Sequence, residues 1–220
     1  MRYEFSWEVI ASSAPLLLVG VVATLELAGS SVAIGLPIGI LGAAARVSRV
    51  RALRRIVGAY VEVIRNTPML VQLYFIFYGL PRLGVRFDSD LTALLALSLY
   101  CGAYVVEIVR AGIEAVDRGQ IEAARALGLG EASVFGRVVL PQAMRTALPA
   151  IGGQVIVMLK LSSLASVIGA EELTYVVVDV VAQTYRSFEL YAMAGLVYLG
   201  LTLGVAALFR AVEARLRVPH

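Results

Sequence analysis

Five charged side chains interrupt otherwise apolar stretches of this sequence, and they are its best candidates for chemistry: Glu62, Arg65, Glu107, Arg110 and Lys160. Arg65 follows Glu62 by three residues, and Arg110 follows Glu107 by three. This spacing places each Glu and Arg on one helix face, where they can neutralise each other. Charges inside membrane spans are costly and usually face a bundle interior or a water-filled path. The pairs therefore predict one charge network at a gate. The alternative is that they lie in the inner headgroup layer.

Lys160 is the only lysine of the sequence. Counted from Leu148, it lies about 18 Å along a helix that rises ~1.5 Å per residue, which is near the middle of a bilayer. Transporter sites tend to lie at that depth. The predicted substrate-binding residues are Lys160, Gln154, Ser162, Ser163, Tyr100 and Tyr104. Two other interpretations stay open, because Lys160 can snorkel to the membrane surface or pair with a Glu for structural reasons.

The sequence offers little to metal, redox or nucleotide chemistry. Cys101 is the only cysteine and lies in an apolar run, and His220, the only histidine, is the last residue. We therefore expect no cofactor, no metal site and no disulfide within the chain. A phosphate-binding loop G-x-x-x-x-G-K-[ST] needs a Lys after a Gly, whereas the only Lys follows Leu159. The chain is thus predicted not to be an enzyme and not to hydrolyse ATP itself.

The elements that must position these side chains are membrane helices. Hydrophobic residues make up 60% of the 220 residues and charged ones 16%, against ~25% charged in soluble domains, and the mean hydropathy is +0.84. We predict an all-α integral membrane protein with one transmembrane domain over residues 1–220. Its five spans are expected at about 14–45, 57–80, 91–115, 148–168 and 190–209. Glycines 35, 39 and 42 in the first span suggest close helix packing, or else only local flexibility.

Arginines indicate which side of the membrane each connection faces. Five Arg lie within residues 46–55, four within 118–145 and three after residue 209, whereas residues 169–189 carry four acids and one Arg. By the positive-inside rule the N-terminus is outside and the C-terminus cytoplasmic. Residues 169–189 are then external, with a short interfacial helix rather than a sixth span, and Asp88 and Glu172 should be accessible from outside. The rival interpretation of the first Arg cluster is a nucleic-acid patch.

The polar segment 118–141 between the third and fourth spans is predicted to form two short helices. The first covers Gln120–Leu127 and ends at Gly128 in a backbone conformation with positive φ; the second covers Glu131–Val139 and ends at Pro141. The alternative is an ordinary polar connecting loop.

Side-chain spacing in this segment suggests docking of another protein. Val134, Phe135, Val138 and Val139 share one face, which is expected to pack down onto the protein. Ala123 and Ala124, backed by Leu127, should let a partner approach the backbone closely, with the Glu122 carboxylate beside them.

The order Glu122-Ala123-Ala124, three residues, Gly128, nine residues, Val138, one residue, Leu140-Pro141 resembles the EAA signature of ABC importer permeases, which usually have Ile where Val138 stands. Five further stretches resemble the polar amino-acid branch of these permeases and extend the resemblance over most of the chain. They are Arg65-Asn66-Thr67-Pro68-Met69-Leu70-Val71-Gln72, Gly102-Ala103-Tyr104 with Glu107 and Arg110-Ala111-Gly112, Gly119-Gln120, Leu140-Pro141-Gln142-Ala143, and Lys160 with Ser162-Ser163-Leu164.

This resemblance implies the permease subunit of a type I importer in the cell (inner) membrane. The expected partners are two cytoplasmic ATPase subunits, a second permease that is identical or related, and an extracytoplasmic solute-binding protein. Glu122, Ala123, Ala124 and Gly128 would couple to the ATPase. Lys160 would hold the α-carboxylate of a polar amino acid, and because its helix offers no acid, glutamine or glutamate is the first expectation.

Two other functional classes were weighed against this one. An ion-coupled carrier acting alone would use Glu62, Lys160 and Glu107, but would leave the EAA segment unexplained. An intramembrane enzyme lacks support, because no motif pairs a nucleophile with a base.

Overall fold

The computed structural model describes residues 4–216 and consists of helices joined by short turns, with no strand in that range. His220 and Arg217 lie outside it. The α-helices are α1 Trp7–Val47, α2 Arg51–Arg65, α3 Met69–Tyr74, α4 Ser89–Glu114, α5 Arg118–Ala126, α6 Glu131–Val134, α7 Leu140–Leu161, α8 Leu173–Thr184 and α9 Ser187–Leu216. Short π or 3-10 helices are η1 Phe75–Gly79, η2 Leu80–Leu83, η3 Phe135–Val139 and η4 Ser162–Ile168. The all-α prediction is confirmed.

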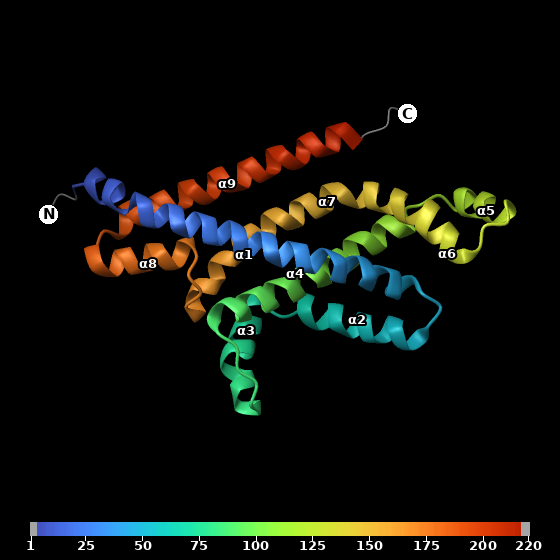
Figure 1. The fold of residues 1–220 in the computed structure, drawn as a ribbon, viewed down its shortest axis with the longest axis horizontal. Coiled ribbons are helices and arrows are strands. Elements are labelled where there is room, and N and C mark those ends of the chain that lie inside the picture. Colours follow the sequence, from blue (N-terminus) through green and yellow to red (C-terminus); the bar gives the residue numbers. More distant parts are fainter. Residues whose placement is uncertain (1–3, 217–220) are drawn as a thin grey trace.

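Four helical stretches among the described residues are long and apolar enough to cross a membrane: 7–47, 89–114, 131–168 and 187–215. α4 is the central one, since 61% of its most apolar stretch is buried inside the chain, compared with 6% for α9. α4 packs between α1 and α7, and α9 lies against α7 at the edge (Figure 1). α9 therefore has few fully buried side chains, and one side of it is exposed along its length. The number of spans and their orientation stay predictions.

The glycines of α1 bring it into close contact with α4. A Cβ added at Gly35 would lie 2.5 Å from the Cβ of Cys101, and one at Gly39 would lie 2.3 Å from Cγ1 of Val105. Only glycine leaves room for these neighbours at the observed helix distance. The predicted close packing of this glycine series is thus observed.

The predicted span 57–80 differs from a single helix. α2 ends at Arg65 and α3 starts at Met69, because Pro68 lacks an amide hydrogen and disfavours helical geometry in the residue before it. The buried Gln72 amide donates hydrogen bonds to the carbonyls of Ile64 (2.8 Å) and Thr67 (2.9 Å), so the break is held in place. Beyond it, α3 turns away from the direction of α2 and extends out from the bundle (Figure 1).

The helix that contains Lys160 starts earlier than predicted. It runs unbroken over 131–168 rather than 148–168, so the expectation that Pro141 ends a separate short helix is wrong. The reason is the π turn η3, in which the Leu140 amide donates to the carbonyl of Phe135, five residues back. This wider turn accommodates a proline that would disrupt a regular α-helix.

Residues 169–189 contain the predicted short helix, α8, but two of their acids are not exposed. Glu172 is 1% exposed and Glu189 is 0% exposed. The Glu172 carboxylate accepts hydrogen bonds from the α8 amide of Tyr175 (2.9 Å), from the Tyr198 hydroxyl on α9 (2.6 Å) and from the Thr24 hydroxyl on α1 (3.4 Å). The prediction that Glu172 is accessible from outside is therefore wrong, because the carboxylate caps α8 inside a three-helix junction.

Candidate coupling segment and charge network

The segment 118–141 forms an elbow at one end of the molecule (Figure 1). Asp117 caps α5 by accepting the Gln120 amide at 3.2 Å. Gly128 ends that helix with φ 79°, as expected, and a Cβ there would meet no atom within 4 Å. The left-handed backbone conformation, not crowding, is therefore what requires glycine.

The faces of the elbow are only partly as predicted. Val134 and Val139 are buried, with Phe135 and Val138 packed against them, so this face does pack down. Ala124 is 5% exposed and lies in the same cluster, while Leu127 is 82% exposed and backs neither alanine. The surface free for a partner is thus formed by Glu122, Ala123 and Leu127.

An ion pair that the sequence did not suggest closes the elbow. The Arg125 guanidinium donates to both carboxylate oxygens of Glu131, at 2.9 and 3.1 Å. Both side chains are about half exposed, so solvent screens the pair and its contribution to stability is small. Its effect is to fix the angle between α5 and α6.

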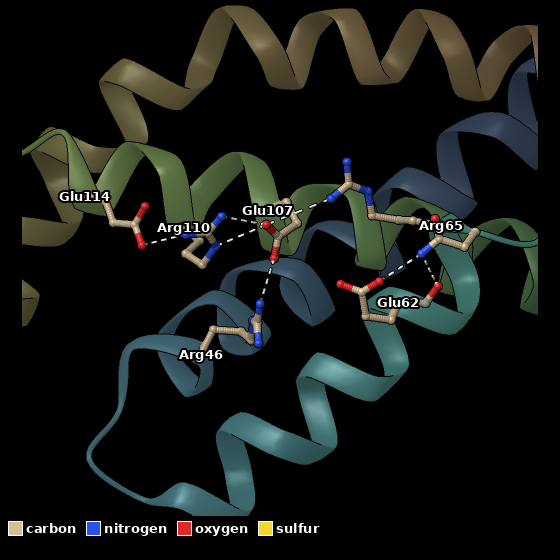
Figure 2. Close-up of polar contacts among 7 residues, drawn as sticks. Arg46, Glu62, Arg65, Glu107, Arg110 and Glu114 are labelled. Atoms are coloured by element: carbon tan, nitrogen blue, oxygen red, sulfur yellow. Dashed lines mark hydrogen bonds and ion pairs between the residues drawn. The ribbon is translucent and has the colours of Figure 1, made fainter.

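Glu107 on α4 is the centre of the charge network (Figure 2). Its Oε2 lies 2.7 Å from Arg110 on the same helix and 3.9 Å from Arg65 on α2, and its Oε1 lies 3.6 Å from Arg46 on α1. Arg110 also pairs with Glu114. One carboxylate therefore joins three helices, with the short contact inside α4 and the two long contacts between helices.

The structure brings three of the four residues of the predicted network together: Arg65, Glu107 and Arg110. Glu62 does not pair with Arg65 but accepts a hydrogen bond from the Asn66 amide at 2.9 Å. Arg65 reaches across to Glu107, as Figure 2 shows, and its guanidinium carbon lies 5.0 Å from the ring centroid of Tyr104. Arg46 and Glu114 were missed. Arg46 was counted only as part of the first Arg cluster, although it lies in the last turn of α1.

An open cleft of about 270 Å³ lies beside this network and is lined by Val61, Glu62, Arg65, Asn66 and Tyr104. Tyr104 stacks on Tyr100, with ring centroids 4.6 Å apart. The cleft therefore combines an acid, a base, an amide and an aromatic surface.

The residues expected around Lys160 bond mostly within their own helix. The Ser162 and Ser163 hydroxyls donate to the carbonyls of Leu159 and Lys160, and the buried Gln154 amide contacts the Met158 sulfur at 3.6 Å. Lys160 is exposed, and within residues 4–216 no hydrogen bond or ion pair engages its ammonium. The six predicted residues thus fall into two groups: the two tyrosines beside the cleft, and the others along the helix of Lys160.

Comparisons with known proteins agree with this architecture. Residues 35–218 match the family described as binding-protein-dependent transport system inner membrane component. The nopaline transport system permease protein NocM of Agrobacterium fabrum is 40% identical over 97% of this chain and 92% of that protein. The arginine transport system permease protein ArtQ of Bacillus subtilis is 38% identical over 92% and 93% of the two chains. The glutamine transport system permease protein GlnP of Escherichia coli is 34% identical over 98% and 99%.

A solved structure has the same fold over nearly the whole chain. The crystal structure of an amino acid ABC transporter with histidines superposes with a TM-score of 0.91 at 39% identity, covering 97% of this chain and 100% of that one.

Proposed function

The chain belongs to the family of binding-protein-dependent transport system inner membrane components, and from this premise we propose that it carries a polar amino acid into the cell at the expense of ATP hydrolysed by separate subunits. The observation that carries the proposal is the elbow 118–141, whose EAA residues end at a glycine with φ 79° and present Glu122, Ala123 and Leu127 on the surface.

Coupling would start at this elbow. Closure of the ATPase pair draws the elbows of two permeases together, and each elbow moves its bundle because the helix from Glu131 continues through Lys160 without a break. A push at α6 is therefore transmitted directly to the helix that holds the substrate. Alternating access of this kind needs two arrangements of the helices around one site.

The charge network supports a gate beside that path. The contacts of Glu107 with Arg46 and Arg65 are 3.6 and 3.9 Å long, whereas its contact with Arg110 is 2.7 Å. The contacts between helices are therefore the ones that can be released while Glu107 stays neutralised on its own helix. Release of the Arg65 contact would let α2 move away from α4 without leaving an unpaired carboxylate.

Lys160 is assigned to the substrate's α-carboxylate. Its ammonium has no partner among the described residues, and a charge at this depth needs an anion. Glutamine or glutamate is the first candidate. Because family members are named for both glutamine and arginine transport, the contact they have in common would be the α-carboxylate rather than the side chain. The open surroundings of Lys160 leave room for a second permease subunit to complete the site.

The test is uptake by the purified complex in vesicles. A tagged permease should co-purify with an ATPase, and Lys160→Met should abolish ATP-dependent glutamine uptake while the ATPase still co-purifies. Arg82→Met, which removes an exposed cation on η2, is the matched control and should leave uptake unchanged. Normal kinetics in Lys160→Met would exclude the carboxylate role, and stronger competition by arginine than by glutamine would exclude the proposed substrate charge. Uptake that follows an ion gradient without ATP would indicate a carrier instead.

A further inference from the structure

Four aromatic side chains gather on the surface where α1 and α9 begin. Phe5 is 39% exposed, Trp7 72%, Tyr185 87% and Phe188 64%. The rings of Phe5 and Trp7 meet edge to face at 4.7 Å, and Phe5 lies 6.2 Å from Phe188. We refer to Phe5, Trp7, Tyr185 and Phe188 as the aromatic patch. It lies at the end of the molecule opposite the coupling elbow (Figure 1).

Polar contacts hold the two helix starts at the same level. The Glu189 carboxylate, which is 0% exposed, accepts the Ser6 amide at 3.0 Å. The Arg186 guanidinium donates to the carbonyl of Glu4 at 2.9 Å and lies 3.5 Å from Glu189. Arg186 and Glu189, beside the aromatic patch, are thus engaged with the protein itself. Whatever fixes the depth of Phe188 in the membrane therefore also fixes the depth of Trp7.

The length of α9 sets that depth. From Phe188 to Arg210, at 1.5 Å per residue, the helix rises ~33 Å, close to the ~30 Å of a bilayer's hydrocarbon core. Residues 190–209 between them carry no charge. Leu196, Leu199 and Leu203 are 64%, 53% and 57% exposed along this stretch, and only 6% of it is buried. The aromatic patch is therefore continuous with an exposed apolar surface long enough to cross the hydrocarbon core.

We propose that the aromatic patch binds the boundary between phospholipid headgroups and acyl chains, in the leaflet away from the arginine clusters. Trp and Tyr are favoured at this boundary because their rings are apolar and their N–H and O–H groups remain hydrated. The depth of the aromatic patch also affects how α1 crosses the membrane. Its 41 residues rise ~61 Å, about twice the hydrocarbon thickness, so it either tilts or extends past the hydrocarbon core. Anchors at helix ends set such tilts.

Trp7 is the only tryptophan of the chain, so the native protein contains its own probe. The full-length permease is reconstituted alone in vesicles whose lipids carry bromine either near the headgroup end or near the methyl end of the acyl chain. Trp7 emission should be shifted to shorter wavelength than that of a tryptophan in water. It should be quenched more by bromine near the headgroups, and only weakly by iodide in the buffer.

Two variants calibrate this measurement on a Trp7→Phe background. Leu199→Trp places the probe midway between Phe188 and Arg210 and should be quenched more by bromine near the methyl end. Leu127→Trp places it on the exposed elbow and should be quenched by iodide and by neither lipid. If the Trp7→Phe protein does not assemble, the wild-type measurement still tests the proposal, because it shows which of the two brominated lipids quenches Trp7 more.

Two results would overturn the proposal. If Trp7 is quenched by iodide like Leu127→Trp, and its emission shifts only when the solute-binding protein is added, the aromatic patch docks a protein. If bromine near the methyl end quenches it most, the aromatic patch lies in the hydrocarbon core and α9 crosses at a different level.

Discussion

Gly128 is the residue at which a single side chain should test coupling most directly. Replacing it with Ala or Val forces a Cβ into a left-handed backbone conformation, at a cost of about 1–2 kcal/mol, although no neighbouring atom is in the way. We expect the elbow to reorient, so that Gly128→Val uncouples binding-protein-stimulated ATP hydrolysis from uptake. Gly130→Ala is the matched control, because Gly130 has φ −67° and equal open space. Equal uptake in both variants would contradict the role of the elbow.

Glu172 should make folding stability depend on pH. Burial raises the pKa of this carboxyl, against the opposing effect of hydrogen bonds from Tyr198, Thr174 and Tyr175. A carboxyl whose pKa is raised on folding stabilises the folded state when protonated, and this contribution is lost as the pH rises through the folded-state pKa. The thermal stability of the wild type relative to Glu172→Gln should therefore fall with rising pH over that window.

The sole cysteine provides the readout for this pH dependence. Cys101 is 1% exposed, so a thiol-reactive fluorogenic dye reports its release on heating. Glu171→Gln, at an exposed neighbouring position, is the control. A wild-type advantage over Glu172→Gln that is constant across pH would show that Glu172 has no raised pKa.

The sequence predicted contacts and backbone conformations correctly where they depend only on residues close together in the chain. The Glu107–Arg110 contact follows from the three-residue interval, and the φ of Gly128 follows from its place after a helix. The reach of Arg65 to Glu107 instead depends on how α2 lies against α4, which no spacing shows. The burial of Glu172 likewise depends on two helices far away in sequence, those of Thr24 and Tyr198.

At the scale of helices, Glu107 should be needed to hold α1 and α2 against α4. Glu107→Gln removes the charge shared by three Arg. It weakens the hydrogen-bonded pair with Arg110, worth about 1.5–3 kcal/mol because charged groups are involved, and the longer ion pairs with Arg46 and Arg65. We expect loss of uptake with ATP hydrolysis less dependent on the binding protein. Glu114→Gln removes a partner of Arg110 alone and should have a much smaller effect. Uptake and ATP hydrolysis are measured in the same vesicles for each variant. Similar losses in Glu107→Gln and Glu114→Gln would argue against a gate at Glu107.

The apolar runs of the sequence predicted where the long helices lie, but they did not predict where all of these helices begin and end. The third span, expected over 91–115, is observed as 89–114. Pro68 and Pro141 look alike in the sequence, yet one separates two helices and the other lies inside a continuous helix. The difference comes from hydrogen bonds made elsewhere, by Gln72 across the first break and by the π turn before the second. Such bonds are features of the folded backbone and leave no pattern in hydropathy.

For the whole molecule, thiol labelling should determine the orientation that arginine counting predicts. On a Cys101→Ala background, cysteines at Arg51 and Arg215 should resist a membrane-impermeant reagent added outside, and cysteines at Asp88 and Glu171 should react. Glu171 is used because Glu172 is buried. Labelling at Arg51 in intact cells would reverse the predicted topology, and labelling after lysis confirms that each cysteine is reactive.

The glycine contacts between α1 and α4 also restrict how the molecule can move. Gly35 and Gly39 face Cys101 and Val105, two pairs with the same four-residue interval on helices that run in the same direction. Sliding α1 by one turn would bring Ser31 or Ala43, both 0% exposed, to a place where only a hydrogen now fits. The register of the two helices is therefore unique, and they should travel as one rigid body through the transport cycle. The internal motion should then occur at joints between other helices, such as residues 66–68 between α2 and α3.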